Sequence, residues 1–423
     1  MAGLQRFSVA PTRSRRTLSP SGSSASDRHQ QRTTADYQQK DWAVNFSFTE
    51  EQQMLQDSAA RFVGQDYSFD RRQQDVGRTT GFDPELWQQF ADLGWLAVPF
   101  EEEHGGFGGN ATDLMLLMEQ MGKGLVAAPY LATVLLFGKL VEAGTVGDLR
   151  DDLLTRVIAG QLQGGVAFME RQARYALADT STRASRTAAG FELSGEKTLV
   201  LNGPVADKLI VSARTGGAQQ DEAGISLFLL DRTTPGLELT DFRLMDGQPV
   251  ANLRLTRVQV TADQLVGPEN DGLALLQRVI DEALPGVCAE ALGLMTHLTN
   301  TTIEYTRARK QFGVAIGSFQ VLQHRMVDMF TACEEIRSLL YRAVCSADKP
   351  GTAEHRRNLH ALKVLTGRRG KRVGNEAIQL HGGMGITDEL DVGHYVKHLM
   401  VLNSLFGDAD YHQQQLATLS LPM

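Results

Sequence analysis

The chain has 423 residues, of which 42% are hydrophobic and 22% are charged, and its formal net charge at pH 7 is −8. This composition is typical of a globular protein with two or three packed units, and the acidic balance argues against nucleic acid as the main partner. No uninterrupted apolar run approaches about 20 residues, so a membrane span is not expected.

Residues 1–45 are predicted to form a disordered extension. Met1–Ala25 contains several arginines and serines and no acidic residue. Mitochondrial transit peptides share this composition, but Pro11 and Pro20 interrupt the segment. A misjudged start codon or a solvated bacterial extension is the simpler interpretation. We therefore expect a cytoplasmic protein, with the mitochondrial matrix as the alternative if residues 1–40 are a transit peptide.

A helical N-terminal domain is expected over residues 46–163. Apolar residues recur at intervals of three and four from Met54 to Val63. Asp83 followed by Pro84 is typical of the start of another helix, where the missing N–H of proline costs nothing. The glycine-rich stretch 104–109 is interpreted as a connector.

From 164 to 268 the pattern changes to short runs of β-forming residues. Turn signals such as Leu201–Gly203 and Thr234–Gly236 separate these runs. The spacing predicts an antiparallel middle β-domain.

Helical periodicity returns over 269–423 and predicts a C-terminal helical bundle. Pro285 is expected in the first turns of its first helix, or at a kink. Cys288, Cys333 and Cys345 form no CxxC pair and are interpreted as free, buried packing residues on helices. The four expected helices span about 271–308, 317–346, 352–381 and 388–419. The predicted fold class is mainly α with a central β-domain.

Two short motifs stand at the ends of predicted helices. The first is Arg309–Gly313, with the sequence RKQFG. Alone it is compatible with an ordinary basic helix end that glycine terminates. The second is Gln379–Gly385, with the sequence QLHGGMG, in which three of four consecutive positions are glycine.

These motifs, together with the helical, β, helical order, resemble the acyl-CoA dehydrogenase family. The resemblance covers nearly everything after residue 45. It implies a flavoprotein oxidoreductase that uses FAD, an acyl-CoA substrate and, as electron acceptor, an electron-transfer flavoprotein. It also implies that Arg309 pairs with the pyrophosphate of a neighbouring chain's cofactor, which suits a guanidinium fork. The residues that the resemblance places at the cofactor are Arg309, Gln311, Phe312, Gln320, Gln379 and Gly383.

The middle domain departs from the family pattern. Relatives carry Thr-Glu-Pro followed by Gly-Ser near the flavin, whereas this chain has the segment Met169–Tyr175. Leu199 replaces an aromatic residue that stacks near the flavin in relatives. These departures argue against binding of a flavin by this chain's own middle domain. The two motifs that would bind a neighbouring chain's flavin are retained.

The family's catalytic base is also missing. A glutamate near the C-terminus removes the α-proton in relatives, and the corresponding residue here is Phe406. Some relatives carry the base on the first C-terminal helix, where this chain has Ala283. The catalytic residue is therefore unknown, and the candidates for a replacement are Asp408, Glu282 and Glu290.

Division of labour between unlike subunits is the other interpretation. The FGDAD ending resembles that of the small subunit of pimeloyl-CoA dehydrogenase and of the heterotetrameric enzymes of steroid side-chain degradation. The resemblance implies a second acyl-CoA dehydrogenase-like subunit that keeps the base, with a homo-oligomer as the alternative. A flavin-free structural subunit is a further possibility. Fatty acyl, dicarboxylic acyl and steroid substrates all remain open.

A metal site is the last alternative. His394 and His398 are spaced for one helix face, and Asp408, Asp410 and His412 follow. Without a third placed ligand, such a pair is usually a helix surface, so no metal is expected.

Overall fold

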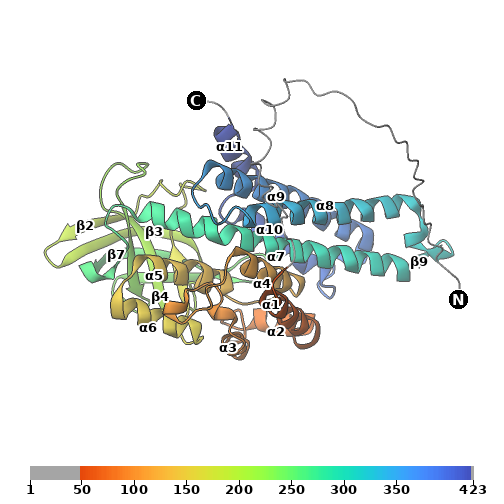
Figure 1. Cartoon of the computed structure of the whole chain (residues 1–423), viewed down its shortest axis with the longest axis horizontal. Helices are drawn as coiled ribbons and strands as arrows, with labels where there is room; N and C mark the ends of the chain where they lie inside the picture. Colours follow the sequence, from red (N-terminus) through yellow and green to blue (C-terminus); the bar gives the residue numbers. More distant parts are fainter. Residues whose placement is uncertain (1–47, 421–423) are drawn as a thin grey trace, which may run out of the picture. The chain divides into compact units, whose positions relative to one another are not determined.

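The computed structural model describes residues 48–420, and the extension predicted for residues 1–45 lies outside this range. Within it the chain forms helices, then a sheet, then helices again (Figure 1). The prediction of a mainly helical fold with a β-domain in the middle is confirmed. No helix in this range is both long and apolar enough to cross a lipid bilayer.

The first helical segment begins with the capping residues that the sequence indicates. Thr49 and Gln52 exchange side-chain hydrogen bonds with each other's main-chain N–H groups, and Asp83 caps the helix that begins at Pro84. The glycine-rich stretch 104–109 leads into α4 as a connector. The elements are α1 (Glu50–Arg61), η1 (Phe62–Asp66), α2 (Phe69–Gly77), α3 (Pro84–Asp92), η2 (Trp95–Ala97), η3 (Glu102–His104), α4 (Ala111–Lys123), η4 (Tyr130–Gly138), α5 (Lys139–Gly144) and α6 (Gly147–Ile158).

The middle segment forms one sheet with the strand order β6-β7-β3-β2-β4-β5-β8. Neighbouring strands are antiparallel with two exceptions: β1 runs parallel to β4, and one pair of residues joins β2 to β4 in parallel. The β1 strand is buried along its whole length, as parallel strands usually are. The strands are β1 (Gly164–Ala167), β2 (Arg183–Thr187), β3 (Gly190–Leu201), β4 (Lys208–Arg214), β5 (Ile225–Asp231), β6 (Leu237–Arg243), β7 (Pro249–Val260) and β8 (Leu265–Val266), and η5 (Ala262–Gln264) precedes β8.

The C-terminal segment is helical throughout except for a short hairpin. Figure 1 shows α7, α8 and α9 side by side, with the β9–β10 hairpin following the end of α7. The elements are α7 (Gly272–Ala308), β9 (Lys310–Gln311), β10 (Val314–Ala315), η6 (Ile316–Ser318), α8 (Gln320–Val344), α9 (Ala353–His381), η7 (Gly382–Ile386), α10 (Val392–Ser404) and α11 (Ala409–Ser420).

The helix predicted over 388–419 is in fact two helices, α10 and α11. Phe406 has a φ of 58° and Gly407 a φ of 117°, and a right-handed helix cannot pass through such residues. Asp408 then starts α11, because its Oδ1 accepts the N–H groups of Asp410 and Tyr411. The break places Phe406 in a bend instead of on a helix face.

Two further details differ from the prediction. Of the two alternatives for Pro285, a place in the first turns of the helix is wrong, because the residue lies well inside α7. The helix continues through the proline because every residue from Ala283 to Met295 is buried, so tertiary packing outweighs the lost hydrogen bond. Cys345 is exposed at the end of α8, whereas Cys288 and Cys333 are buried as predicted.

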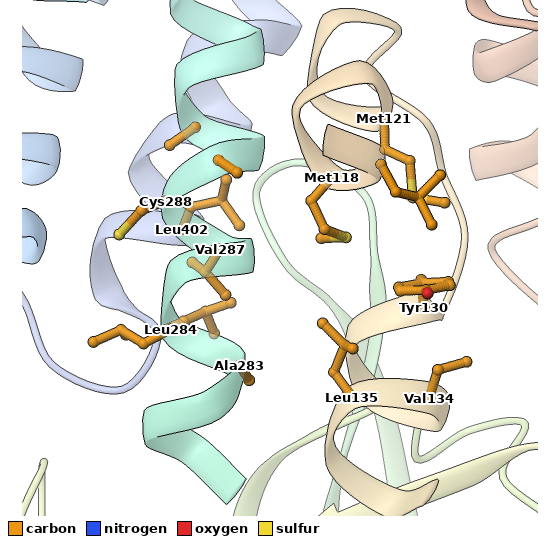
Figure 2. Close-up of a cluster of buried hydrophobic side chains, with 14 of the residues drawn as sticks. Met118, Met121, Tyr130, Val134, Leu135, Ala283, Leu284, Val287, Cys288 and Leu402 are labelled. Carbon is orange, nitrogen blue, oxygen red and sulfur yellow. The ribbon is translucent and has the colours of Figure 1, made fainter. Parts of the chain in front are cut away.

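Close packing of α4 on α7 sets how α7 is rotated about its axis. A Cβ at Gly122 would lie 2.0 Å from the main-chain oxygen of Glu290, and a Cβ at Gly293 would lie 2.1 Å from that of Glu119. Only glycine permits this approach. Figure 2 shows Met118 of α4 and Leu135 of η4 on one side and Ala283 and Val287 of α7 on the other.

Candidate active site

Two cavities border the bend between α10 and α11. Leu405 lines one of them and its neighbour Phe406 lines the other. We call them the Leu405 cavity and the Phe406 cavity. Their unfilled space, including the part open to solvent, is about 730 Å³ and about 480 Å³. The position expected for the catalytic glutamate therefore faces a cavity, but it carries a phenyl ring.

One face of α7 forms a wall of the Phe406 cavity. Gln277, Ile280, Asp281 and Leu284 follow the three- and four-residue spacing of one helix face, and all four line the cavity. The Phe406 ring stacks on Phe168, with 6.4 Å between ring centroids. The remaining lining residues are Met169, Arg174, Tyr175, Leu177, His360, Tyr411 and His412.

Asp281 is the one carboxylate among these lining residues, all of which lie within residues 48–420. Its Oδ1 accepts a hydrogen bond from Gln277 Nε2 at 2.8 Å, and desolvation raises the pKa of the Asp281 carboxyl. The sequence indicated Glu282 as a candidate base, and Asp281 was not among the candidates. One step along a helix turns the side chain by about 100°, and Glu282 is exposed, with Arg278 Nε 3.9 Å from its Oε1. The helical spacing from Leu284 back to Asp281 could have identified it.

Asp408 is engaged elsewhere. Its Oδ1 caps α11 at 3.1 Å from Asp410 N and 2.8 Å from Tyr411 N, and its Oδ2 accepts from the Tyr175 hydroxyl at 3.4 Å. It does not line either of the two cavities described here. Asp408 therefore organises the bend, and the structure does not place it as a base.

A pair of histidines supports the main chain at Phe406. His412 Nε2 lies 3.2 Å from the Phe406 carbonyl oxygen, which can only accept, so Nε2 carries the proton. Burial lowers the pKa of His412 to about 3 and that of His360 to about 4, so both rings are neutral at pH 7. His412 Nδ1 must then accept from His360 Nδ1 at 2.8 Å. The pair holds the bend without adding charge to the cavity.

A buried ion pair anchors the loop that carries Arg174 and Tyr175. Glu170 Oε1 lies 2.7 Å from Lys197 Nζ, and Glu170 also accepts the N–H groups of Ser181 and Thr182. Burial opposes the charge of Glu170, but Lys197 outweighs it and lowers the pKa of Glu170 to about 2. Lys197 thus holds Glu170 in place, and the loop that follows Glu170 lines the Phe406 cavity.

A charged cluster, which we call the His398 cluster, borders the Leu405 cavity: Glu290 and His398 line the cavity, and Asp246 lies behind His398. His398 Nδ1 lies 2.7 Å from Asp246 Oδ2, and its Nε2 lies 2.8 Å from Glu290 Oε1. Burial disfavours a charged ring, yet the two carboxylates outweigh it and raise the pKa of His398 to about 9. Glu290, a candidate base by sequence, is therefore paired in the other cavity, away from Phe406.

The His398 cluster predicts a pH-dependent stability. The ordinary pKa of histidine is 6.5 and the folded value is about 9, so the stabilisation is complete below pH 6.5 and is lost as the pH rises through 9. Wild type should lose about 3 kcal/mol of unfolding free energy relative to His398→Gln between pH 6 and pH 10, since one pKa unit is about 1.4 kcal/mol. Urea unfolding of both proteins at several pH values measures this difference. Parallel pH profiles would show that His398 is not charged in the fold.

His394 and His398 do not converge on one point. His394 Nε2 lies 3.3 Å from Asp388 Oδ1, whereas His398 is enclosed by the cluster. Within residues 48–420 no group of three or more His, Cys, Asp or Glu side chains is arranged to hold a metal ion.

The predicted cofactor residues lie at one end of the C-terminal helices. Arg309 and Gln311 are exposed at the β9–β10 hairpin, and the Phe312 side chain at its tip is 91% exposed. Tyr305, one turn before Arg309, stacks on His381 with 4.4 Å between ring centroids. The stacking joins the end of α7 to the end of α9, so it brings the two sequence motifs together.

The second motif leaves open space beside the main chain. A Cβ at Gly383 would meet no atom within 4 Å, and Gln379 in the last turn of α9 is exposed. Gln320 is exposed at the start of α8. The six predicted cofactor residues, all within 48–420, line neither the Leu405 cavity nor the Phe406 cavity. An exposed guanidinium and exposed amides suit phosphate oxygens, and the open glycine lets a ligand approach the main chain.

Sequence models of three domains match almost the whole described range. The acyl-CoA dehydrogenase N-terminal domain matches residues 49–161, the middle domain matches 165–258 and the C-terminal domain matches 270–420.

Curated relatives agree with these matches. The chain is 28% identical over 356 residues to a probable acyl-CoA dehydrogenase, YngJ of Bacillus subtilis (strain 168), covering 82% of this chain and 92% of that protein. It is also 28% identical over 341 residues to the L-prolyl-(peptidyl-carrier protein) dehydrogenase of Serratia sp. (strain ATCC 39006), covering 78% and 87%.

Solved structures with the same fold include flavin complexes. PigA with FAD and proline superposes with a TM-score of 0.81 at 26% identity, covering 88% of this chain and 98% of that one. Butyryl-CoA dehydrogenase from Megasphaera elsdenii gives a TM-score of 0.81 at 25% identity, covering 88% and 99%. The match to a complex with FAD agrees with the predicted cofactor.

Proposed function

This chain belongs to the acyl-CoA dehydrogenase family, and on that premise we propose that it takes part in the FAD-dependent α,β-dehydrogenation of an acyl-CoA thioester as one subunit of a heteromer. FAD accepts the β-hydride in this chemistry. Two features support an incomplete subunit. The cofactor-binding motifs are retained on the surface, and the position of the family's base carries Phe406.

The chain's own part is to complete a flavin site and to shape the reaction cavity. Arg309 supplies a charge-assisted fork for pyrophosphate oxygens, and Gln311 and Gln379 supply hydrogen bonds beside it. Because these side chains lie outside this chain's cavities, the flavin they hold belongs with a neighbouring chain. The neighbour in turn supplies the base. Phe406 keeps this chain's cavity apolar at the point where a carboxylate would stand.

The observation that carries the proposal is the phenyl ring of Phe406 in the cavity, 6.4 Å from Phe168, with no proton acceptor on it. The test is to purify the chain alone and together with any acyl-CoA dehydrogenase-like protein that a neighbouring gene encodes. FAD per chain and acyl-CoA oxidation with an electron-transfer flavoprotein are then measured. We expect the isolated chain to be flavin-poor and inactive, and the pair to regain both properties. Full flavin content and activity in the isolated homo-oligomer would contradict the heteromer.

Asp281 supports a second candidate, in which this chain has a base of its own. Its carboxylate lies in the Phe406 cavity with a raised pKa, which suits a proton acceptor. If the isolated chain oxidises acyl-CoA, loss of that activity in Asp281→Asn with intact flavin binding would favour this candidate over the heteromer.

Replacing Arg309 should weaken flavin binding. We expect Arg309→Gln to lower the affinity of the assembled protein for FAD by about tenfold or more, because a charge-assisted hydrogen bond to pyrophosphate is lost. Fluorescence titration with FAD measures the affinity. Arg307→Gln, an exposed arginine one half-turn earlier on α7, is the matched control. Equal affinities for the two variants would remove Arg309 from the flavin site.

A structural subunit without flavin is the remaining alternative. An absorption spectrum of the assembled protein without bands near about 370 and 450 nm would favour it, since these bands belong to bound flavin. We further propose a cytoplasmic location and an electron-transfer flavoprotein as the electron acceptor, following the family resemblance.

A further inference from the structure

The lining of the Leu405 cavity combines an apolar part, the amide side chains of Asn202 and Gln248, and one charged wall. Its apolar part comes from α4, the segment that leads into η4, and α10, and Figure 2 shows Met118, Met121, Tyr130 and Leu402 of this lining. The charged wall consists of Glu290 on α7 and His398 on α10. An apolar cavity with a few placed polar groups is the usual form of a small-molecule site.

The hydrogen-bonding capacity of the His398 cluster is not fully used. Asp246 accepts from His398 and, through Oδ1, from the N–H of Gln248 at 3.1 Å, and its main-chain oxygen accepts from Arg72 Nη2. Glu290 accepts only from His398, through Oε1. Among residues 48–420, no other group bonds to the Glu290 carboxylate, which is 8% exposed and lines the cavity. One carboxylate oxygen is thus left for a ligand.

The charges of the His398 cluster also indicate that Glu290 is the group available to a ligand. A ring that lies within 2.8 Å of two carboxylates through both nitrogens donates from both, so one imidazolium serves two anions. The charge of Arg72 also interacts favourably with Asp246, but Arg72 bonds to the main-chain oxygen of that residue and does not line the cavity. The group that faces the cavity is the less satisfied carboxylate, Glu290.

We propose that the Leu405 cavity is an acyl subsite for substrates whose acyl group carries a hydrogen-bond donor, a hydroxyl or an amine, which Glu290 accepts. The proposal rests on the proposed function, since it assumes an acyl thioester at the neighbouring Phe406 cavity. Leu405 and Phe406 are consecutive and line one cavity each, and in this proposal the far end of an acyl group that reacts beside Phe406 lies in the Leu405 cavity near Glu290. A plain alkyl chain would cover the free carboxylate oxygen and leave it without a hydrogen bond, which disfavours such a ligand.

The test compares acyl groups that differ only at the far end. Hexanoyl-CoA, ω-hydroxyhexanoyl-CoA and ω-aminohexanoyl-CoA are titrated by calorimetry into the assembled, FAD-loaded protein, with the butanoyl and octanoyl series to vary the reach. We expect the hydroxyl or amine analogue to bind about tenfold or more tightly than the alkyl analogue at the best length, since a satisfied hydrogen bond replaces an unsatisfied one. A preference for the amine alone would identify a cationic substrate, and a preference for the hydroxyl alone would identify a neutral one.

Glu290→Gln tests the residue itself. The variant keeps the size of the side chain but removes the anion, so the preference for a donor should fall by about tenfold, whereas Glu304→Gln, exposed on the same helix and outside both cavities, should retain it. The comparison of acyl-CoA analogues on the wild-type protein tests the subsite even if Glu290→Gln does not fold. If the alkyl analogues bind as tightly as the polar ones at every length and are oxidised, the polar subsite is wrong and the proposed function is retained. Failure of every acyl-CoA to bind would overturn both.

Discussion

Phe406→Glu should raise the rate of acyl-CoA dehydrogenation by about 100-fold or more. The rate is measured in FAD-loaded protein, and any base that a partner subunit supplies is first removed by mutation. General base catalysis contributes about 10²–10⁴ in rate. The phenyl ring already projects into the Phe406 cavity, so a glutamate there places a carboxylate in the same space. Initial rates with an alkyl acyl-CoA and an artificial electron acceptor measure the effect.

Phe406→Gln is the matched control. Glutamine has the shape of glutamate and leaves the same gap against Phe168, but it cannot accept the α-proton. We expect no gain with glutamine. An equal gain in both variants would attribute the effect to the space vacated by the ring. No gain in either, with FAD still bound, would show that the α-proton is removed away from the Phe406 cavity.

Glu170→Gln should destabilise the fold by about 3–5 kcal/mol, because it leaves the Lys197 ammonium buried without its counter-ion. Lys197 has no measurable exposure, and Ser212 Oγ at 3.0 Å would be its nearest remaining partner. The loop from Glu170 to Tyr175 should loosen as well, since the same carboxylate holds the N–H groups of Ser181 and Thr182. Urea unfolding, followed by tryptophan fluorescence, gives the free energy.

A double-mutant cycle isolates the pair. Lys197→Met removes the cation and fills most of its volume, so Glu170→Gln combined with Lys197→Met should be less destabilised than the sum of the single variants. Strictly additive losses would mean that the two groups do not interact. The cycle also separates this structural role of Glu170 from any direct contact with flavin, because FAD affinity can be measured on the same four proteins.

Short-range signals explain what could be predicted correctly from the chain alone. The Thr49 and Asp83 caps, the change from helical to strand periodicity near residue 164 and the glycine that ends RKQFG each depend on a few neighbouring residues. Such patterns are set by local hydrogen bonding and side-chain spacing. The three-part architecture followed from them, and the family followed from the resemblance of the RKQFG and QLHGGMG motifs. The prediction of a single helix over 388–419 was wrong because the chain bends at Phe406. A positive φ is unusual for such a bulky residue, and the neighbouring sequence gives little sign of it.

The cavities depend on contacts between residues far apart in the chain. His398 joins Asp246 to Glu290 across a strand connection and two helices, and His360 joins His412 from another helix. No local pattern indicates which of many charged residues will meet. The sequence marked Glu290 and His398 as separate candidates for different chemistries, and only folding showed that each is the other's partner.

The amino-acid sequence alone determined the family, the order of its three segments and the absence of an acidic residue at position 406. The tertiary structure alone decided that Asp281 faces the Phe406 cavity while Glu282 faces solvent. The reason is the rotation of α7 about its axis. Gly122 and Gly293 let α4 approach its main chain to a distance that any Cβ would forbid, and that contact between distant segments fixes which side of the helix looks inward.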